Sequence, residues 1–299
     1  MTSVSGFLLT TCHVQKDGLD DLFRLVGSVE AALGAAEVAS LQQIILLQGC
    51  DPKRRSEIEP RLPDWVTLLS TERSLSSPTA RNAMIDHLLG DESFNPDAFV
   101  GFPDDDCWYP AGSLACVAGH FEAQPGLQLL VSRYGPSPSA AKCIIARRAT
   151  LQQALSRSGC AAIFVRASLL AELGGFHELL GLGTELRGGE DTEFVHRAFH
   201  SAKGEAAYVS GTLVGHAAAD PAKKATYYEG GLAALMAHSR RSPAARVALL
   251  RKIGVGAWLV IRKRMLPRDY FGSLRKARMN APRLRSGRKV SPSAPAQGL

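Results

Sequence analysis

The feature that most constrains the fold is the alternation of short apolar runs with amphipathic stretches over the first 130 residues. A short apolar run fits a buried strand, whereas apolar residues spaced three and four apart mark one face of a helix. Residues 19–33 show the second pattern, with Leu22, Leu25, Val26 and Val29 on one face. The alternation predicts an α/β domain with a mainly parallel sheet. The expected strands are 6–12, 43–47, 65–69 and 97–102, and the expected helices are 19–33 and 79–89.

From residue 112 onwards the pattern becomes mixed, and a glycine-rich loop occupies residues 181–189. A second helical segment, 222–239, precedes a basic stretch with apolar stripes and a Pro/Ser/Arg tail whose last ten residues we expect to be disordered. We therefore expect an α/β domain over 1–217 and a helical extension over 218–299. The further expected strands are 127–133, 161–165, 206–210 and 212–216, and the further helices are 112–123, a short one ending at Gly174, and 190–200.

The net charge of +7 on 299 residues is unevenly distributed. From Arg240 to the C-terminus there are 16 Lys and Arg residues and one acid, Asp269, so that residues 1–239 carry a net charge of −8. An acidic body with a basic tail does not favour a nucleic-acid-binding domain, which carries its basic residues on the folded face. It fits a domain tethered to an anionic membrane surface. The alternative is a helix packed on the catalytic domain with a solvated basic face.

The cysteines and the N-terminus indicate a reducing compartment. The six cysteines include no CxxC pair, so neither a zinc cluster nor a disulfide framework is predicted, and buried reduced thiols are expected. The chain opens with no secretory signal pattern, and the longest uncharged run near its C-terminus, residues 253–261, is too short to span a bilayer. We expect a cytoplasmic protein that can lie peripherally at the inner face of the cell membrane.

Three acidic residues, Asp104, Asp105 and Asp106, directly follow an apolar strand. Adjacent carboxylates repel one another unless a cation or protons compensate, and Mg²⁺ and Mn²⁺ prefer carboxylate and phosphate oxygens. Ligands of parallel sheets bind beyond the carboxyl ends of the strands, which is where this triplet lies. The segment therefore indicates a site for a metal and a diphosphate, with a solvated acidic turn as the alternative.

Two further candidates lie later in the chain. Glu190 and Asp191 begin a predicted helix, where free N–H groups keep a carboxylate ionised, as a base that deprotonates a sugar hydroxyl must be. Plain helix capping is the alternative. His216 ends the strand TLVGH. A lone histidine after a strand is more often a packing residue than a ligand, and it gains interest only beside the aspartates.

Taken together, these elements resemble the glycosyltransferase family 2 enzymes, which have the GT-A fold. The resemblance covers most of residues 5–240, and the order and spacing of its motifs are more specific than any one of them. It implies a metal-dependent, inverting transferase of hexosyltransferase type that uses a nucleotide sugar. The matching segments are LLTTCHVQKDGLDDLFRLVGSV, SSPTARNAMI, FPDDDCWYP with its DxD motif, GLGTELRGGEDTEFVHRA with an acceptor loop and an ED motif, GTLVGH, and YYEGGLAALMAH, which is similar to a polysaccharide-building subset.

The resemblance assigns the acidic residues to the metal and the donor. Asp106 would bind the divalent ion, Mn²⁺ or Mg²⁺, and Asp104 would meet the ribose or sugar and contribute to the metal site. An alignment on Trp108 instead puts Asp105 at the metal position, so both registers stay open. His216 matches a metal-linked histidine.

The resemblance also assigns the base and the donor-binding residues. Asp191 matches the base that takes the acceptor hydroxyl proton, with Glu190 as its neighbour. Trp108 is either an aromatic that stacks on a sugar face or one of the core or rim, and Gly183 and Thr184 fall in the acceptor loop. The acid that usually meets the uracil after the second strand is missing. The residues assigned to the nucleotide or diphosphate are Thr10, Thr11, Gln48 or Asp51, and Arg81.

The implied reaction transfers a sugar, from a UDP-sugar in the first instance, to a hydroxyl of a saccharide or lipid-linked saccharide during cell-surface polysaccharide synthesis. Two other classes stay open. A nucleotidyltransferase of similar fold would need a glycine-rich basic loop near the N-terminus, which residues 10–18 do not resemble. A non-catalytic, membrane-associated protein would not need Asp104, Asp106 and Asp191.

Overall fold

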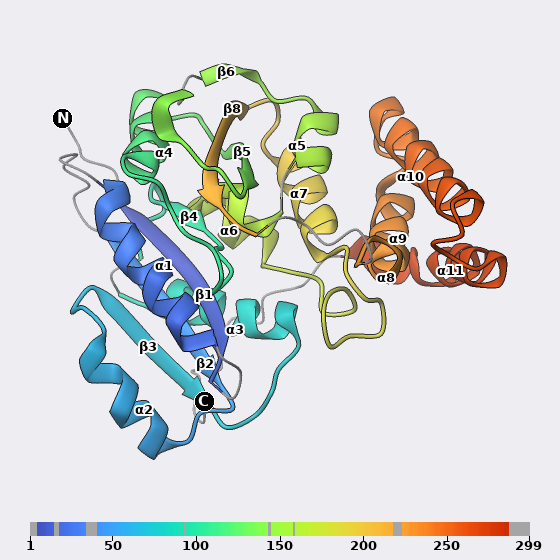
Figure 1. Ribbon diagram of the computed structural model, residues 1–299. Helices are drawn as coiled ribbons and strands as arrows, with labels where there is room; N and C mark the ends of the chain where they lie inside the picture. The colour runs from blue at the N-terminus through green and yellow to red at the C-terminus, as the bar shows by residue number, and fades with distance from the viewer. Residues whose placement is uncertain are drawn as a thin grey trace.

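The computed structural model describes residues 5–14, 18–33, 41–92, 94–142, 145–157, 159–217 and 223–286. Its strands form one mixed sheet of eight, ordered β3-β2-β1-β4-β7-β5-β8-β6 (Figure 1). Four strand pairs are parallel, and β7 and β6 make the antiparallel pairs. The predicted mainly parallel sheet is confirmed. The strands are β1 Gly6–His13, β2 Leu41–Gln48, β3 Val66–Thr71, β4 Phe99–Gly101, β5 Leu129–Gly135, β6 Ile145–Arg148, β7 Ile163–Arg166 and β8 Ala206–Gly215.

Helices cover both faces of this sheet because each face presents a separate apolar surface. One buried cluster joins the sheet to α3, α5, α6 and α7, and another joins it to α1 and α4. A smaller cluster packs α1 and α2 beside β2 and β3. The helices are α1 Gly18–Leu33, α2 Pro52–Ile58, α3 Ser77–Gly90, α4 Ser113–Ala123, α5 Leu151–Arg157, α6 Ala167–Leu173, α7 Glu190–Ser201, α8 Lys223–Thr226, α9 Tyr228–His238, α10 Pro243–Ile261 and α11 Pro267–Asn280.

The predicted elements match the observed ones except in a few places. The two late strands expected over 206–216 are one strand, β8, because shifts in its register with β5 absorb the irregularity at the Ser-Gly step between the apolar runs. The helix expected over 222–239 is divided into α8 and α9. The prediction missed α2, α5, α11 and β6, which are short or strongly polar segments.

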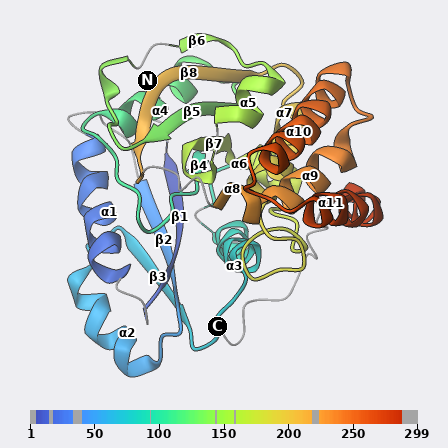
Figure 2. The same ribbon diagram turned by 45° about the vertical axis from the view of Figure 1, so that its right-hand side comes forward.

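The last helices form a third core. In both views α9, α10 and α11 lie together beside the sheet (Figures 1 and 2), and their buried cluster includes Leu232, Leu259 and Ala277. Leu180 and Leu186, from the loop before α7, join this cluster. The division at residue 217 stays a prediction, and the tail expected to be disordered lies outside the described residues. Within the described residues, no helix combines the length and hydrophobicity needed to cross a bilayer.

The cysteines follow the expectation only in part. Cys12, Cys50, Cys107 and Cys160 are buried reduced thiols outside any disulfide, which is the predicted state. Cys116, by contrast, is disulfide-bonded. The prediction that no cysteine pairs is therefore wrong for Cys116, since the sequence spacing gives no sign of which residues the fold brings together.

One buried arginine joins several segments of the sheet region. Arg166 ends β7 with 4% of its surface exposed. Its guanidinium donates only to backbone carbonyls, so its removal would leave several buried acceptors without a donor. The accepting oxygens are those of Asp97 at 2.6 Å, Leu127 at 2.8 Å, Phe121 at 3.2 Å and Gln124 at 3.3 Å.

We expect Arg166→Met to lower the free energy of unfolding by about 3 kcal/mol, because carbonyls at the end of α4 and beside two strands lose their donor. Urea denaturation followed by circular dichroism measures the change. Arg148→Met is the matched control, since Arg148 is 81% exposed and makes only a 3.8 Å surface ion pair with Glu205. Equal stability of the two variants would contradict the anchoring role of Arg166.

A buried polar cluster attaches α7 to α9. Glu193 Oε1 accepts a hydrogen bond from Arg197 Nε at 2.7 Å and lies 2.9 Å from Nε2 of His238. The ring of His196 stacks on that of His238 at 4.8 Å and lies 4.6 Å from that of His200. Burial, together with the neighbouring histidines, lowers the pKa of His196 to about 3. Burial acts to raise the pKa of Glu193, but Arg197 and His238 outweigh it and hold that pKa at about 2.

This cluster predicts a loss of stability in mild acid. The folded protein keeps His196 neutral down to about pH 3, whereas the unfolded chain takes up that proton near the ordinary value of 6.5. Between these values the unfolded state binds more protons, so the free energy of unfolding falls as the pH falls. We expect a loss on the order of 2 kcal/mol from His196 between pH 7 and pH 5.

In His196→Phe this part of the pH dependence should disappear, while the control His87→Phe, at a partly exposed position on α3, should keep it. Urea denaturation at pH 7, 6 and 5 provides the measurement. The contribution of Glu193 is lost only below its ordinary value of 4.5, so it does not interfere in this range. An unchanged pH slope in His196→Phe would refute the assignment.

Candidate functional site

Arg81 brings together the two acidic motifs. It lies on α3 with 6% of its surface exposed. Its Nη2 is 2.8 Å from Oδ1 of Asp104, which follows β4, and its Nη1 is 3.4 Å from Oδ1 of Asp191, in the first turn of α7. The two carboxylates thus lie within the reach of one guanidinium. Two segments that are far apart in the sequence therefore meet at this side chain.

The position of Asp191 depends on the start of α7. Gly189 caps this helix with φ +87°, and a Cβ there would collide with the backbone of Gly230 on α9. Only glycine combines this left-handed backbone with so close an approach. The backbone N–H of Cys160 donates to the second carboxylate oxygen of Asp191 at 3.0 Å. Asp191 is therefore held from two sides, with one oxygen toward Arg81 and the other toward Cys160.

The charges around Arg81 stabilise one another. Burial acts to lower the pKa of Arg81, but the surrounding acidic groups raise it, among them Asp104, Asp191 and Glu190. Burial is also the main cause that raises the pKa of Glu190 to about 7, with a further contribution from Asp191 and opposition from Arg81. Arg81 remains a cation, and Glu190 can take up or release a proton near neutral pH.

The aspartate triplet separates into two directions. Asp104 faces Arg81, and Oδ1 of Asp106 lies 3.5 Å from Nε2 of His216. Asp105 instead accepts a hydrogen bond from the thiol of Cys12 on β1, and its burial raises its pKa to about 6. This arrangement favours the register in which Asp104 and Asp106 form the DxD pair and Asp105 packs against the sheet.

His216 completes a group of side chains that can hold a divalent ion. One ligand atom from each of Asp104, Cys107 and His216 lies within 4.8 Å of the others. Nδ1 of His216 lies 2.7 Å from the carbonyl of Ala217, so a proton on Nδ1 satisfies that contact and leaves the Nε2 lone pair toward Asp106. Burial raises the pKa of the Cys107 thiol, which makes it a poor ligand. Oxygen and imidazole donors fit Mn²⁺ or Mg²⁺, with Mn²⁺ accepting the imidazole more readily.

Trp108 connects the acidic segment to the end of β8. Its backbone N–H donates to the carbonyl of Gly215 at 3.1 Å, and its own carbonyl accepts from Gly215 at 2.7 Å. A Cβ on Gly215 would collide with the indole ring, so the close approach requires glycine. The guanidinium of Arg24 lies 5.0 Å from that ring and donates to the carbonyl of Asp106 at 2.8 Å. Trp108 therefore acts as a packing residue that brings His216 to Asp106, whatever else it contacts.

The residues assigned to the nucleotide mostly serve the fold. Thr10 is fully buried and accepts a hydrogen bond from Gln43 at 3.0 Å. Gln48 is also buried, donates to Thr11 at 2.6 Å and accepts from the backbone of Leu75 at 2.6 Å. Asp51 caps α2 by accepting from the backbone of Arg54 at 2.7 Å, and its surface is exposed. Of these residues, Thr11 and Asp51 keep partly or fully exposed surface.

The acceptor-loop residues hold their loop together. The hydroxyl of Thr184 lies within hydrogen-bond distance of the carbonyls of Leu179, Gly181 and Leu186, at 2.9 to 3.1 Å. Gly183 packs against Ser76 at the start of α3. The loop thus lies beside the helix that carries Arg81, which brings it close to the acidic motifs.

The sequence interpretation missed three residues that contact this site: Arg24, Cys160 and Tyr134. The ring of Tyr134 lies edge-on to that of His216, with 5.5 Å between their centroids. Tyr134 lies near the end of β5, and β5 and β8 run parallel, so residues at their ends meet at one edge of the sheet. In the sequence, the only sign of Tyr134 was its position directly after the predicted strand 127–133. Cys160 acts through its backbone N–H, which no side-chain motif indicates.

No protein-family model matches the chain, and no curated protein matches it either. Solved structures do match. The chain is similar to TarS of S. aureus, with a TM-score of 0.53 and 14% identity, over 95% of this chain and 55% of TarS. It is also similar to the mannosyltransferase PcManGT from Pyrobaculum calidifontis, solved in complex with GDP-Man and Mn²⁺, with a TM-score of 0.53 and 14% identity, over 91% of this chain and 72% of that one.

The chain spans about half the length of TarS. At this identity the likeness concerns the fold, and it agrees with the strand order and the helical layers described above. The chain has the GT-A fold, as predicted.

The geometry predicts which residues hold a divalent ion. We expect His216→Ala and Asp106→Asn each to weaken Mn²⁺ binding at least about tenfold, as loss of a metal ligand or its support does. Cys107→Ala should bind Mn²⁺ like the unchanged protein, because a protonated thiol contributes little. Electron paramagnetic resonance of free Mn²⁺, titrated with protein in the presence of UDP or GDP, measures the affinity. A large loss in Cys107→Ala alone would refute this ligand set.

Proposed function

We propose that this protein is a glycosyltransferase that moves a sugar from a nucleoside diphosphate sugar to a hydroxyl group. The observation that carries the proposal is the convergence of Asp104 and Asp191 on the buried cation Arg81. One carboxylate follows a central strand and the other begins a helix, so a donor and an acceptor can meet between them. The GT-A fold and the nucleotide-sugar complex of the mannosyltransferase support the same interpretation.

The donor end of the site consists of Asp104, Asp106 and His216, which would hold Mn²⁺ or Mg²⁺. When bound, such an ion neutralises negative charge on the leaving nucleoside diphosphate. Arg81 adds a permanent positive charge beside Asp104 that is available to the diphosphate. We propose a UDP-sugar as the donor, on the resemblance to family 2, and GDP-Man is the second donor to test because the mannosyltransferase was solved with it.

The acceptor end is assigned to Asp191. Its carboxylate takes the proton of the acceptor hydroxyl while that oxygen forms a bond to the anomeric carbon. The bond from that carbon to the diphosphate oxygen breaks on the opposite face, so the configuration inverts and no covalent sugar–enzyme intermediate forms. The N–H of Cys160 fixes one oxygen of Asp191 at 3.0 Å. Glu190 is the neighbouring acid, and its burial raises its pKa to about 7.

The proposal also includes the acceptor and the cellular role of the protein. We propose a saccharide or lipid-linked saccharide as the acceptor, a hexosyl group as the cargo, and a cytoplasmic place in cell-surface polysaccharide synthesis. Membership of glycosyltransferase family 2 belongs to the same proposal. The support is the set of motifs around Arg81, Asp104, Asp191 and His216, in the order and spacing that the family shows.

The decisive experiment measures release of nucleoside diphosphate from UDP-sugars and GDP-Man with Mn²⁺ or Mg²⁺ and a panel of saccharide acceptors. We expect Asp191→Asn to lower kcat by about 10²–10⁴-fold, the usual contribution of a general base, while donor affinity measured by calorimetry stays unchanged. Asp64→Asn, an equal change at an exposed turn before β3, is the matched control and should keep full activity.

Other outcomes would overturn the proposal in distinct ways. Release of pyrophosphate would indicate nucleotidyl transfer by the same fold. Absence of any metal-dependent binding of a nucleotide sugar would indicate a non-catalytic protein. Full activity in Asp191→Asn would leave the transferase standing and exclude Asp191 as its base.

A further inference from the structure

The exposed apolar side chains of this protein are concentrated in one place. Of the ten large apolar side chains that are exposed in the described residues, eight belong to α10, α11 and the turn between them. Isolated exposed apolar residues are ordinary, but a contiguous group of them marks a contact surface. The eight are Val247, Leu250, Val255, Trp258, Ile261, Leu266, Phe271 and Met279.

Helix α10 is apolar on both of its sides. Its inner side packs on the third core through Leu259 and Gly256, which are buried. Its outer side presents Leu250, 67% exposed, and Ile261, 77% exposed. Together with Val247 and Trp258 they are spaced three, eight and three positions apart, so all four lie along one stripe of the helix. A helix with apolar residues on both sides is usually covered on both sides. Within the described residues, other elements cover only the inner side of α10.

Positive charge surrounds this stripe. Residues 240–286, which lie in the described part of the extension, include 14 Lys and Arg residues and one acid, Asp269. The guanidinium groups of Arg262 and Arg264 lie 5.6 Å and 5.8 Å from the ring centroid of Trp258. The apolar stripe therefore ends in a group of cations at the turn into α11.

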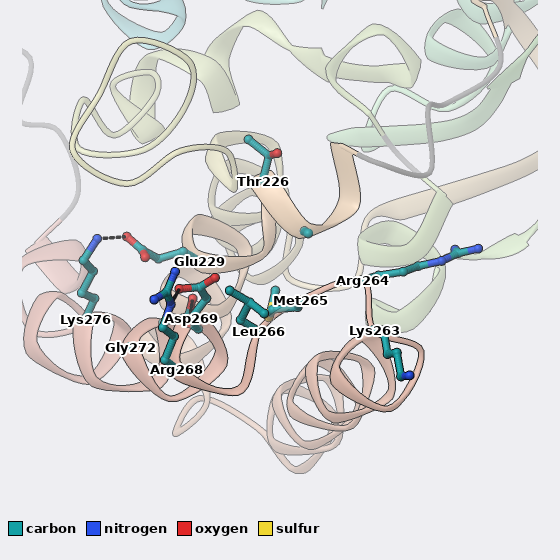
Figure 3. Close-up of a pocket in the computed structure, with 12 residues that line it drawn as sticks. Thr226, Glu229, Lys263, Arg264, Met265, Leu266, Arg268, Asp269, Gly272 and Lys276 are labelled. Carbon is teal, nitrogen blue, oxygen red and sulfur yellow. Dashed lines mark hydrogen bonds and ion pairs between the residues drawn. The ribbon is translucent and has the colours of Figure 1, made fainter.

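A cavity of ≈ 590 Å³ opens at the same turn (Figure 3), and none of the residues that line it belongs to the acidic motifs. Its lining includes Lys263, Arg264 and Arg268 together with the exposed Leu266. Two of its cations are paired, Lys276 with Glu229 at 3.3 Å and Arg268 with Asp269 at 3.6 Å. Figure 3 shows Lys263 and Arg264 extending from the turn on the side away from these pairs. The cavity thus offers positive charge beside apolar surface, which suits a phosphate attached to an acyl chain.

We propose that the outer side of α10 and the turn into α11 dock on an anionic phospholipid bilayer. Trp258 and Ile261 enter the headgroup region, and Arg262, Arg264 and Arg268 contact lipid phosphates. Helices that lie in the membrane interface typically combine an apolar side with flanking arginines and a tryptophan, and α10 has this composition. A second copy of the chain would bring two strongly positive faces together, and a nucleic acid would leave the apolar stripe uncovered. This proposal does not depend on the glycosyltransferase assignment.

The test uses the full chain and sedimentation with vesicles, either of pure phosphatidylcholine or with 30% phosphatidylglycerol. We expect binding to the anionic vesicles only. Replacing Arg262, Arg264 and Arg268 by Gln should weaken partitioning about a hundredfold, since each charge near an anionic surface contributes about 1 kcal/mol. The matched control replaces Lys53, Arg54 and Arg73 by Gln, three exposed cations on and near α2, and should bind like the unchanged protein.

A second measurement distinguishes insertion from charge attraction alone. The double variant Leu250→Ser, Ile261→Ser should also lose binding, and its circular dichroism spectrum shows whether α10 still folds. The blue shift of tryptophan fluorescence on vesicles should disappear in Trp258→Phe, which keeps an apolar ring and should still bind. The proposal fails if the anionic vesicles are not bound, if the Gln variant binds like its control, or if size exclusion shows a dimer that the Ser variant dissociates.

Discussion

The site depends on a buried cation that balances several acids. Arg81 is almost fully enclosed, and a guanidinium so placed is stable only if carboxylates surround it. Asp104 and Asp191 provide them from two segments that are remote in the sequence. The same contact holds the two acids close together without forcing them to share a proton. The contacts of Arg81 thus compensate its own buried charge and also position Asp104 and Asp191 at the edge of the sheet.

Helix α7 connects this site to the helical extension. Its first turn carries both Asp191 and Glu193, and Glu193 contacts Arg197 and the α9 residue His238. Gly189, at the start of the helix, lies against the backbone of α9. A change in how α9 and α10 are placed would therefore reach the helix that holds Asp191. The proposed membrane-docking surface on α10 and the proposed base on α7 thus lie on two helices that both pack against α9.

Much of the fold was predictable because burial leaves a periodic trace in the sequence. The apolar runs predicted β1 and β2, and the helical spacing predicted α1 nearly to its ends. Where periodicity is weak the prediction failed: α2 is short and polar, and β6 has four residues. The single strand β8 was divided in the prediction because an irregular register, which only pairing with β5 reveals, interrupts its apolar pattern.

Asp104, Asp106 and Asp191 could be identified from the sequence alone, because they follow an apolar run or begin a helical segment. How these acids are used depends on contacts between distant segments. The tertiary structure turned Asp105 toward Cys12, buried Thr10 and Gln48 in the fold, and brought the backbone of Cys160 to Asp191. The physical reason is that periodicity records which side of an element is buried, whereas a contact between distant segments depends on strand order and register, which no local pattern records.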